Sequence, residues 1–130
     1  MKILIDTACW LWSLSEPQHL NKKARDLISD PGQTLFLSAA SSWEIAIKAA
    51  LGRLRLPESP EKYIPARMAA FNVLGLPVEH THALRVFALP PHHRDPFDRI
   101  LISQAQIEGM TILTADRSFA PYDVKTIWAV

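Results

Sequence analysis

Asp95-Pro96-Phe97-Asp98-Arg99-Ile100-Leu101-Ile102-Ser103-Gln104-Ala105 opens the stretch of sequence that decides the fold. Aspartate followed by proline predicts the start of a helix, because aspartate caps helices and proline fits their first position. The helix is predicted to continue to Glu108 and to end at Gly109. The apolar run Met110–Leu113 follows at once and is typical of a buried strand. A helix that leads directly into a buried strand is the repeating unit of an α/β fold.

Similar units precede this stretch along the chain. Other short apolar segments predict strands at Lys2–Ile5, Thr34–Leu37 and Val73–Val78, with a further edge strand at Lys125–Trp128. The helices predicted between them are Ala8–Ser15, Asn21–Ser29, Ser41–Leu51, Glu61–Phe71 and His82–Ala88. This alternation predicts an α/β fold, with a mostly parallel central sheet of four to five strands flanked by helices.

The composition is that of one globular domain spanning residues 1–130. Hydrophobic residues make up 48% of the chain and charged residues 21%, which excludes a disordered chain. The 14 basic and 13 acidic residues nearly balance, so charge alone neither indicates nor forbids a nucleic-acid partner. The four glycines are scattered, which excludes the glycine-rich phosphate loops of nucleotide-binding proteins.

The N-terminal sequence and the single cysteine predict a reducing, cytoplasmic environment. The start, Met1–Asp6, lacks the charged and long apolar regions of a signal peptide. No apolar run approaches the length of about 20 residues that a membrane span requires, so no membrane association is expected. Cys9 has no partner for an intrachain disulfide and is predicted to be a small buried side chain.

Four acidic residues stand at related positions of this pattern. Asp6 follows the first strand, and Asp116 follows the fourth strand by two residues. Glu44 is predicted in the first turn of the helix after the second strand, and Asp98 in the first turn of its own helix. The carboxyl ends of parallel strands lie at one edge of a sheet, where the following helices begin. The four carboxylates are therefore expected to converge there.

Such a cluster of acids predicts a metal site. Carboxylates in a shared site raise one another's pKa values unless a cation compensates them. Ligand sets made only of oxygen suit Mg²⁺ or Mn²⁺ rather than zinc. One or two such ions held by carboxylates are typical of enzymes that hydrolyse phosphodiester bonds.

Several of these acids also have structural explanations, which remain open. Ser41 and Glu44 have the spacing of a capping box, and Glu44 is placed to pair with Lys48 one turn later. Asp95 is predicted to be the N-cap of its helix. Asp116 could cap a turn.

Five segments resemble those of PIN-domain ribonucleases, and more narrowly those of the VapC-type toxins of bacterial and archaeal toxin–antitoxin operons. The resemblance covers essentially the whole chain, in order and at family length. The segments are Leu4–Thr7, Ser42–Lys48 (Ser-Trp-Glu-Ile-Ala-Ile-Lys), Leu51–Leu54, Asp95–Ala105 and Leu113–Asp116.

The resemblance implies a site. The residues that match the four acids of the family, expected to be catalytic and to bind metal, are Asp6, Glu44, Asp98 and Asp116. Asp95 matches an additional acid of the subfamily, whose role is open. Thr7 and Thr114 match hydroxyl positions beside the acids, where they could contact water on the metal or orient a carboxylate. Ala115 stands where many members carry arginine, so one charge on the substrate side is missing.

The resemblance also implies a function. It implies a Mg²⁺-dependent endoribonuclease that cuts structured RNA, with transfer or ribosomal RNA as the expected substrate. A small antitoxin protein encoded beside it would inhibit the enzyme, and the active form would be a homodimer.

Three basic residues lie within one turn of a predicted metal ligand: Lys48, Arg99 and Arg117. Each could neutralise a phosphate of the RNA or pair with a neighbouring carboxylate. The spacing of the histidines does not place two imidazoles on one helix face, so His80, His82, His92 and His93 are predicted to be loop or surface residues.

Other functions suit the sequence less well. A phosphorelay receiver requires an aspartate near the middle of the chain, and none lies between Asp30 and Asp95. A haloacid-dehalogenase-like phosphatase requires a second aspartate two residues after the first, where Ala8 stands. The remaining alternative is a PIN-fold module that binds RNA or protein without cutting it. Such a module would be expected to lack some of the four acids.

Overall fold

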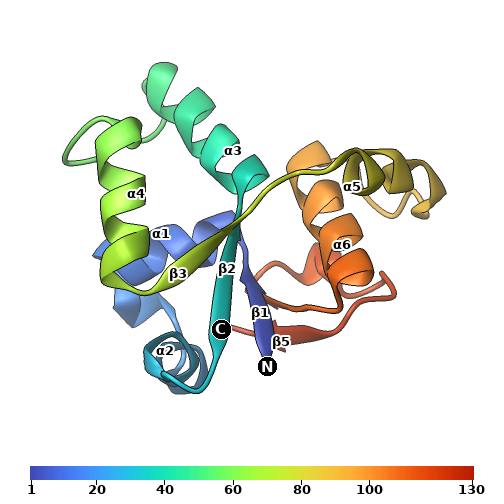
Figure 1. The fold of residues 1–130 in the computed structure, drawn as a ribbon, viewed down its shortest axis with the longest axis horizontal. Helices are drawn as coiled ribbons and strands as arrows, with labels where there is room; N and C mark the ends of the chain where they lie inside the picture. Colours follow the sequence, from blue (N-terminus) through green and yellow to red (C-terminus); the bar gives the residue numbers. More distant parts are fainter.

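Five parallel strands form the centre of the protein in a computed structural model that describes residues 1–130 (Figure 1). The strands are β1 (Lys2–Ile5), β2 (Thr34–Ser38), β3 (Val73–Leu76), β4 (Thr111–Thr114) and β5 (Thr126–Trp128). Their order across the sheet is β3-β2-β1-β4-β5, and every neighbouring pair is parallel. The predicted sheet is confirmed, including its short edge strand.

Six α-helices connect the strands. They are α1 (Thr7–Ser15), α2 (Lys22–Ser29), α3 (Ala39–Ala50), α4 (Pro60–Ala70), α5 (His80–Arg85) and α6 (Pro96–Glu108). Short 3₁₀ turns cover Pro17–His19, Val86–Ala88 and Arg117–Phe119. The helix predicted at His82–Ala88 therefore begins two residues earlier and tightens into a 3₁₀ turn at Val86.

Helix α3 begins earlier than predicted, because β2 runs into it without a loop. Ser38, the last residue of β2, caps the helix and accepts a hydrogen bond from the Ala40 amide at 3.0 Å. Ser41 is fully buried, and its hydroxyl accepts a hydrogen bond from the Thr7 hydroxyl at 2.9 Å. The predicted capping box is thus wrong, and Glu44 lies in the second turn of α3.

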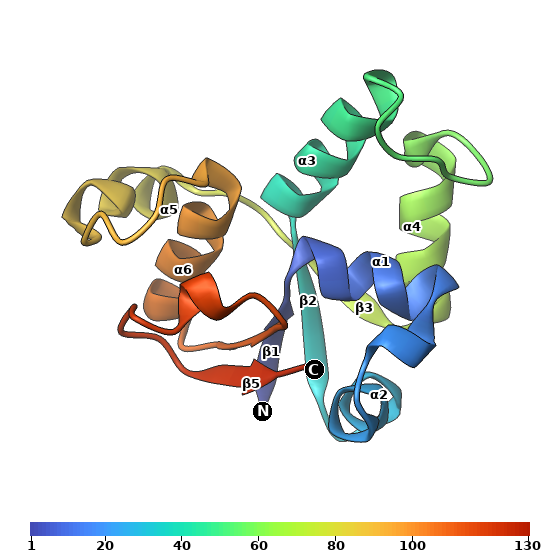
Figure 2. The same cartoon turned by 180° about the vertical axis from the view of Figure 1, so that it is seen from behind.

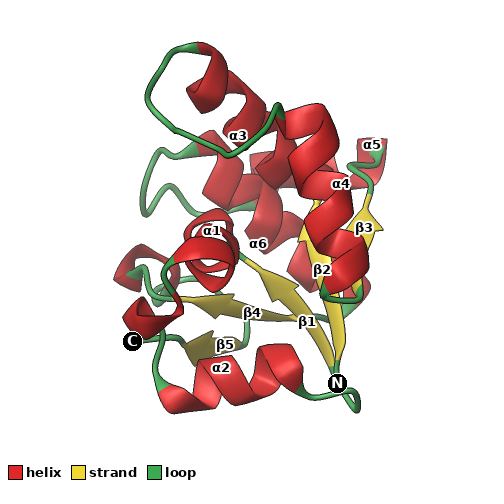
Figure 3. Cartoon of the chain, turned by 90° about the vertical axis from the view of Figure 1, so that its left-hand side faces the viewer, coloured by secondary structure: helices red, strands yellow, loops and turns green.

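The two faces of the sheet bury separate apolar cores. Side chains alternate along a strand, so Ile3 and Ile5 contribute to one core and Leu4 to the other. Helices α1, α2 and α4 lie on the first face and α5 and α6 on the second, as the two opposite views show (Figures 1 and 2). Seen from the side, α1, α2 and α4 lie in front of the strands (Figure 3). The sheet is therefore a rigid layer between two layers of helices.

The strand order contains a topological switch point. The chain passes outward from β1 through β2 to β3, and then returns to place β4 on the other side of β1. In open α/β sheets, ligands bind outside the carboxyl ends of the strands at such a point. The register pairs Ile5 with Leu113, so the residues that follow β1 and β4 emerge side by side there. Each helix is too short or too polar to cross a lipid bilayer.

We expect Gly109 to be required for the end of α6. It has φ of 66° and ψ of 43°, a left-handed conformation that costs other residues about 1 kcal/mol or more. Gly109→Ala should lose about 1 kcal/mol of unfolding free energy, and Gly109→Asn less. Urea denaturation measures both. Gly75→Ala is the control, because Gly75 has no left-handed φ and an added Cβ meets only Met68 Cε, at 3.7 Å. Equal stability of Gly109→Ala and wild type would contradict the expectation.

Candidate active site

Asp6 is the most firmly held of the four predicted acids. Its amide donates to the Leu113 carbonyl at 3.0 Å, which ties the end of β1 to β4. One carboxylate oxygen, Oδ1, accepts from the Cys9 amide at 2.8 Å and caps α1. The other, Oδ2, accepts from the Thr114 hydroxyl at 2.5 Å. Burial raises the pKa of Asp6, and these hydrogen bonds oppose that rise.

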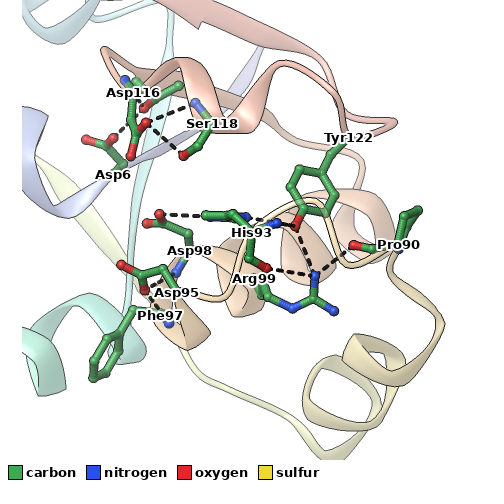
Figure 4. A network of polar contacts seen from close by, with 11 residues as sticks. Asp6, Pro90, His93, Asp95, Phe97, Asp98, Arg99, Asp116, Ser118 and Tyr122 are labelled. Atoms are coloured by element: carbon green, nitrogen blue, oxygen red, sulfur yellow. Dashed lines mark hydrogen bonds and ion pairs between the residues drawn. The ribbon is translucent and has the colours of Figure 1, made fainter.

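The pKa of Asp98 is raised by the charges of the other acids in the cluster. Burial is the main cause that raises the pKa of this carboxyl to about 8. The further causes are the negative charges of Asp95, Asp116, Asp6 and Glu44, in that order. Acids that are far apart in the sequence thus lie within electrostatic range of one carboxyl group. Three of the four predicted acids, Asp6, Asp98 and Asp116, lie near one another at the carboxyl edge of the sheet (Figure 4). Glu44 is the last of the charges that act on Asp98.

Glu44 and Asp116 complete the cluster, and both also make structural contacts. Glu44 is buried, and its Oε2 pairs with the Lys48 ammonium at 2.7 Å. Asp116 is exposed, and its Oδ1 accepts from the amide and hydroxyl of Ser118 at 2.9 and 2.7 Å. The ion pair and the turn cap predicted as alternatives are therefore both present. Neither contact removes the carboxylate from the cluster.

Asp95 caps α6, as predicted. Its Oδ1 accepts hydrogen bonds from the amides of Phe97 at 2.9 Å and Asp98 at 3.2 Å. The side chain is exposed, yet its negative charge acts on Asp98 more strongly than any other. Asp95 therefore positions the first turn of α6 and also contributes to the field at the site.

The two threonines differ in their contacts. Thr114 is fully buried and orients Asp6, as the sequence suggests. Thr7 donates to Ser41 rather than to a carboxylate, and so joins the start of α1 to α3. Of the two roles considered for Thr7, the orientation of a carboxylate is therefore not observed.

The basic residues have contacts that the sequence does not reveal. Arg99 pairs with no carboxylate, because its guanidinium donates to the carbonyls of Val86, Leu89 and Pro90 and to the Tyr122 hydroxyl. Two of these carbonyls, those of Val86 and Pro90, also accept hydrogen bonds from the backbone amides of Leu89 and His92, so the guanidinium adds a second donor to them. Arg117 is exposed and lies over the Trp128 ring, 4.0 Å from its centroid. Lys48 is half-exposed in its ion pair with Glu44.

The structure adds two residues to the site that the sequence analysis missed. His93 lies in a loop, in line with its prediction as a loop or surface residue, but its side chain is largely buried, with its Nε2 3.2 Å from Asp98 Oδ2. The hydroxyl of Tyr122 lies 2.7 Å from His93 Nδ1 (Figure 4). The position of His93, five residues before Asp98, was a weak signal. Nothing in the sequence pattern indicated Tyr122.

The donor chemistry of the cluster fits a hard divalent cation. Asp98 Oδ1, Glu44 Oε1 and Asp116 Oδ2 accept no hydrogen bond within the protein and are free to be ligands. No three of the histidine, cysteine and acidic side chains are grouped as a ready set of ligands for one ion. Mg²⁺ does not require such a set, because it usually binds one or two carboxylates and keeps several waters.

Comparison with known proteins identifies the fold family. The family model of the PIN domain matches residues 3–125. The chain belongs to the PIN-domain family. The resemblance read from the sequence motifs is therefore confirmed, as is the predicted α/β architecture with its parallel sheet.

Similar proteins include one that is named a ribonuclease and several solved structures, one of which is a toxin–antitoxin complex from Klebsiella pneumoniae. Ribonuclease VapC16 of Mycobacterium tuberculosis is 42% identical over 60 residues, or 46% of this chain and 43% of that protein. The chain thus matches less than half the length of this relative. VapBC2 of Rickettsia felis, solved with a DNA fragment from its promoter, superposes over 100% of both chains with a TM-score of 0.77 at 11% identity. FitAcB of Neisseria gonorrhoeae superposes over 96% of both chains with a TM-score of 0.61 at 20% identity.

The raised pKa of Asp98 predicts how stability depends on pH in the presence of a chelator. The folded state holds a proton up to a pKa of about 8, whereas the ordinary value is 3.8. The folded state therefore binds more protons in this window, and stability must fall as the pH rises through it. Asp98→Asn should flatten the fall and be more stable than wild type at the alkaline end.

Urea denaturation between about pH 5 and about pH 8 measures this dependence. Asp123→Asn, which changes an exposed acid outside the cluster, is the control and should follow wild type. A wild-type stability that rises with pH over the window while Asp98→Asn runs parallel to it would contradict the prediction.

Proposed function

We propose that this PIN-domain protein is a divalent-metal-dependent endoribonuclease, which acts in the cytoplasm as the toxin of a toxin–antitoxin pair. The observation that carries the proposal is the placement of Asp6, Asp98 and Asp116 near one another at the carboxyl edge of the sheet (Figure 4), with Glu44 close enough for its charge to act on Asp98. Buried acids that raise one another's pKa are costly to the fold unless a cation compensates them. Perturbed groups of this kind concentrate at functional sites.

In this proposal the four carboxylates hold Mg²⁺ or Mn²⁺. When bound, the ion supplies an activated water for attack on a phosphodiester and neutralises charge on the phosphate. Asp6 is held at both oxygens, so it serves as the fixed point of the site. Asp98, Glu44 and Asp116 each keep an oxygen that no protein group occupies.

The remaining residues have supporting roles in the proposal. Lys48 and Arg117 flank the cluster with exposed or half-exposed positive charge and can contact RNA phosphates. Thr114 fixes the orientation of Asp6. Arg99 is engaged by carbonyls and Tyr122, so it is assigned to the scaffold rather than to the substrate.

The substrate and the protein partner are inferred from the similar proteins. One similar protein is named a ribonuclease, and one superposed structure is a toxin–antitoxin complex. We therefore assign RNA as the substrate, with transfer or ribosomal RNA as the class, and a cognate antitoxin as the inhibitor. A homodimer is the expected active form. The alternative, a PIN module that binds without cutting, has no observation in its favour, because all four acidic positions are filled.

The proposal predicts the chemistry of the RNA ends. The purified protein with Mn²⁺ should cut structured RNA and leave 5′-phosphate ends, because an attack by water does not use the 2′-hydroxyl. Chelation should abolish the cutting. Asp6→Asn should lose nearly all activity, whereas Asp123→Asn should retain it. End-group analysis of the products decides the mechanism, and a 2′,3′-cyclic phosphate would overturn it. Binding of RNA without any cutting would favour the alternative module.

Asp95 and Asp98 should respond differently to the same change. Asparagine caps helices as well as aspartate does, so Asp95→Asn should keep the stability and remain within a few-fold of wild-type activity. Asp95→Ala should lose about 1 kcal/mol through the lost cap. Asp98→Asn should keep the fold and lose most activity. Melting temperatures with chelator and initial rates at saturating Mn²⁺ test the set. If Asp95→Asn is as inactive as Asp98→Asn, then Asp95 belongs to the catalytic site.

A further inference from the structure

We propose that His93 is a positioning residue that holds the Asp98 carboxylate through a hydrogen bond from its Nε2, and that Tyr122 and Arg99 restrict it to the tautomer able to do so. The inference deepens the proposed function and rests on it for the role of Asp98. Its structural part, the tautomer, can be tested separately.

The contacts of the Tyr122 hydroxyl determine the tautomer. A tyrosine hydroxyl has one proton to donate and two lone pairs that accept. Both acceptor positions are filled by groups that can only donate, Arg99 Nη1 at 2.9 Å and the His93 amide at 3.2 Å. The single proton of the hydroxyl is therefore directed at its third neighbour, His93 Nδ1, at 2.7 Å. In neutral imidazole the other nitrogen, Nε2, must then carry the hydrogen.

The Nε2–H group faces Asp98. Its acceptor is Asp98 Oδ2, at 3.2 Å (Figure 4). The donated hydrogen bond favours the ionised carboxylate, against the burial and the neighbouring negative charges that raise its pKa. It also occupies Oδ2 and leaves Oδ1 without a protein partner. Asp98 is thus held in one orientation, with one oxygen available to a cation.

The far end of this chain of contacts is rigid. Tyr122 is buried, and Arg99 is fixed by carbonyls of the segment that precedes α6, the shortest contact being 2.8 Å to Pro90. Both His93 and Asp98 are about four-fifths shielded from solvent, with side-chain exposures of 18% and 19%. A hydrogen bond in such surroundings is stronger than one in water. Groups that orient a metal ligand in this way typically change metal affinity or activity about 10- to 100-fold when removed.

The neighbouring histidine provides a matched control. His92 is exposed and makes only a ring-edge contact with Tyr122, with centroids 4.9 Å apart. None of the hydrogen bonds of the site involves the His92 side chain. It shares the loop and the residue type, but not the proposed role.

The tautomer is measured by long-range ¹H–¹⁵N spectra of the imidazoles in the full-length protein with chelator, at a pH above about 8, where the Asp98 carboxyl is ionised and accepts from Nε2. We expect His93 to show a protonated Nε2 and an unprotonated Nδ1, and His92 to show a mixture of tautomers. Tyr122→Phe removes the proton donated to Nδ1 and should shift His93 toward a mixture. A protonated Nδ1 on His93 in the wild-type protein would overturn the inference. This measurement needs neither metal nor RNA.

The positioning role is measured by variants. His93→Ala should weaken Mn²⁺ binding, so that an about 10- to 100-fold higher Mn²⁺ concentration is needed to raise the melting temperature. It should also lower kcat by about 10- to 100-fold, while KM for RNA changes little. His93→Gln should recover part of both, because its terminal amide N–H can replace Nε2–H. His92→Ala should match wild type. Wild-type behaviour of His93→Ala in both measurements would overturn the inference, and so would a rise in KM alone.

The outcomes separate this inference from the proposed function. If the wild-type protein cuts no RNA, the proposed function fails. The role of His93 is still tested by its tautomer and by the Mn²⁺ dependence of the melting temperature. If RNA is cut but His93→Gln is no better than His93→Ala, the hydrogen bond from Nε2 is not what holds Asp98. In that case the function stands and the inference does not.

Discussion

The buried carboxylate of Asp6 is the constraint on which the rest of the site depends. A carboxylate removed from water costs several kcal/mol unless polar groups compensate it. Here Thr114 and the first turn of α1 supply those groups, and the backbone bond to Leu113 closes the β1–β4 junction beside them. The same junction is the topological switch point of the sheet. An arrangement that makes one buried acid tolerable therefore also fixes where the other acids meet.

The other acids arrive on elements that are held independently of one another. Glu44 comes from α3, which starts directly from β2, and Asp116 comes from a turn that it caps itself. Asp98 comes from α6, and the Arg99 guanidinium donates hydrogen bonds to carbonyls of the segment that precedes this helix. Each carboxylate thus has its own support, so their mutual repulsion does not have to be overcome by contacts among them. Burial and this repulsion together raise the pKa of Asp98, and a bound cation would compensate the negative charge.

The sequence predicted those features that depend on local pattern. Apolar runs followed by acids located Asp6 and Asp116, and aspartate-proline located the start of α6, because these signals lie within a few residues of the structures they specify. The error at α3 has the same origin. Ser41 offers a good capping pattern, but β2 ends without a loop and Ser38 takes the cap first. A local rule cannot choose between two adequate caps three residues apart when the end of a strand decides.

The contacts around His93 could not be predicted from local sequence patterns. They join residues up to 29 positions apart, and they depend on side chains whose direction is set by tertiary packing. Arg99 stands one residue after Asp98, where a role toward phosphate or carboxylate was reasonable. The carbonyls of Val86, Leu89 and Pro90 in the preceding segment accept from its guanidinium instead, at 3.3, 3.2 and 2.8 Å. These contacts hold Arg99 beside the Tyr122 hydroxyl, which contacts His93, and His93 contacts Asp98. The backbone of the segment before α6 is thus linked, through three side chains, to the orientation of an acid in the site.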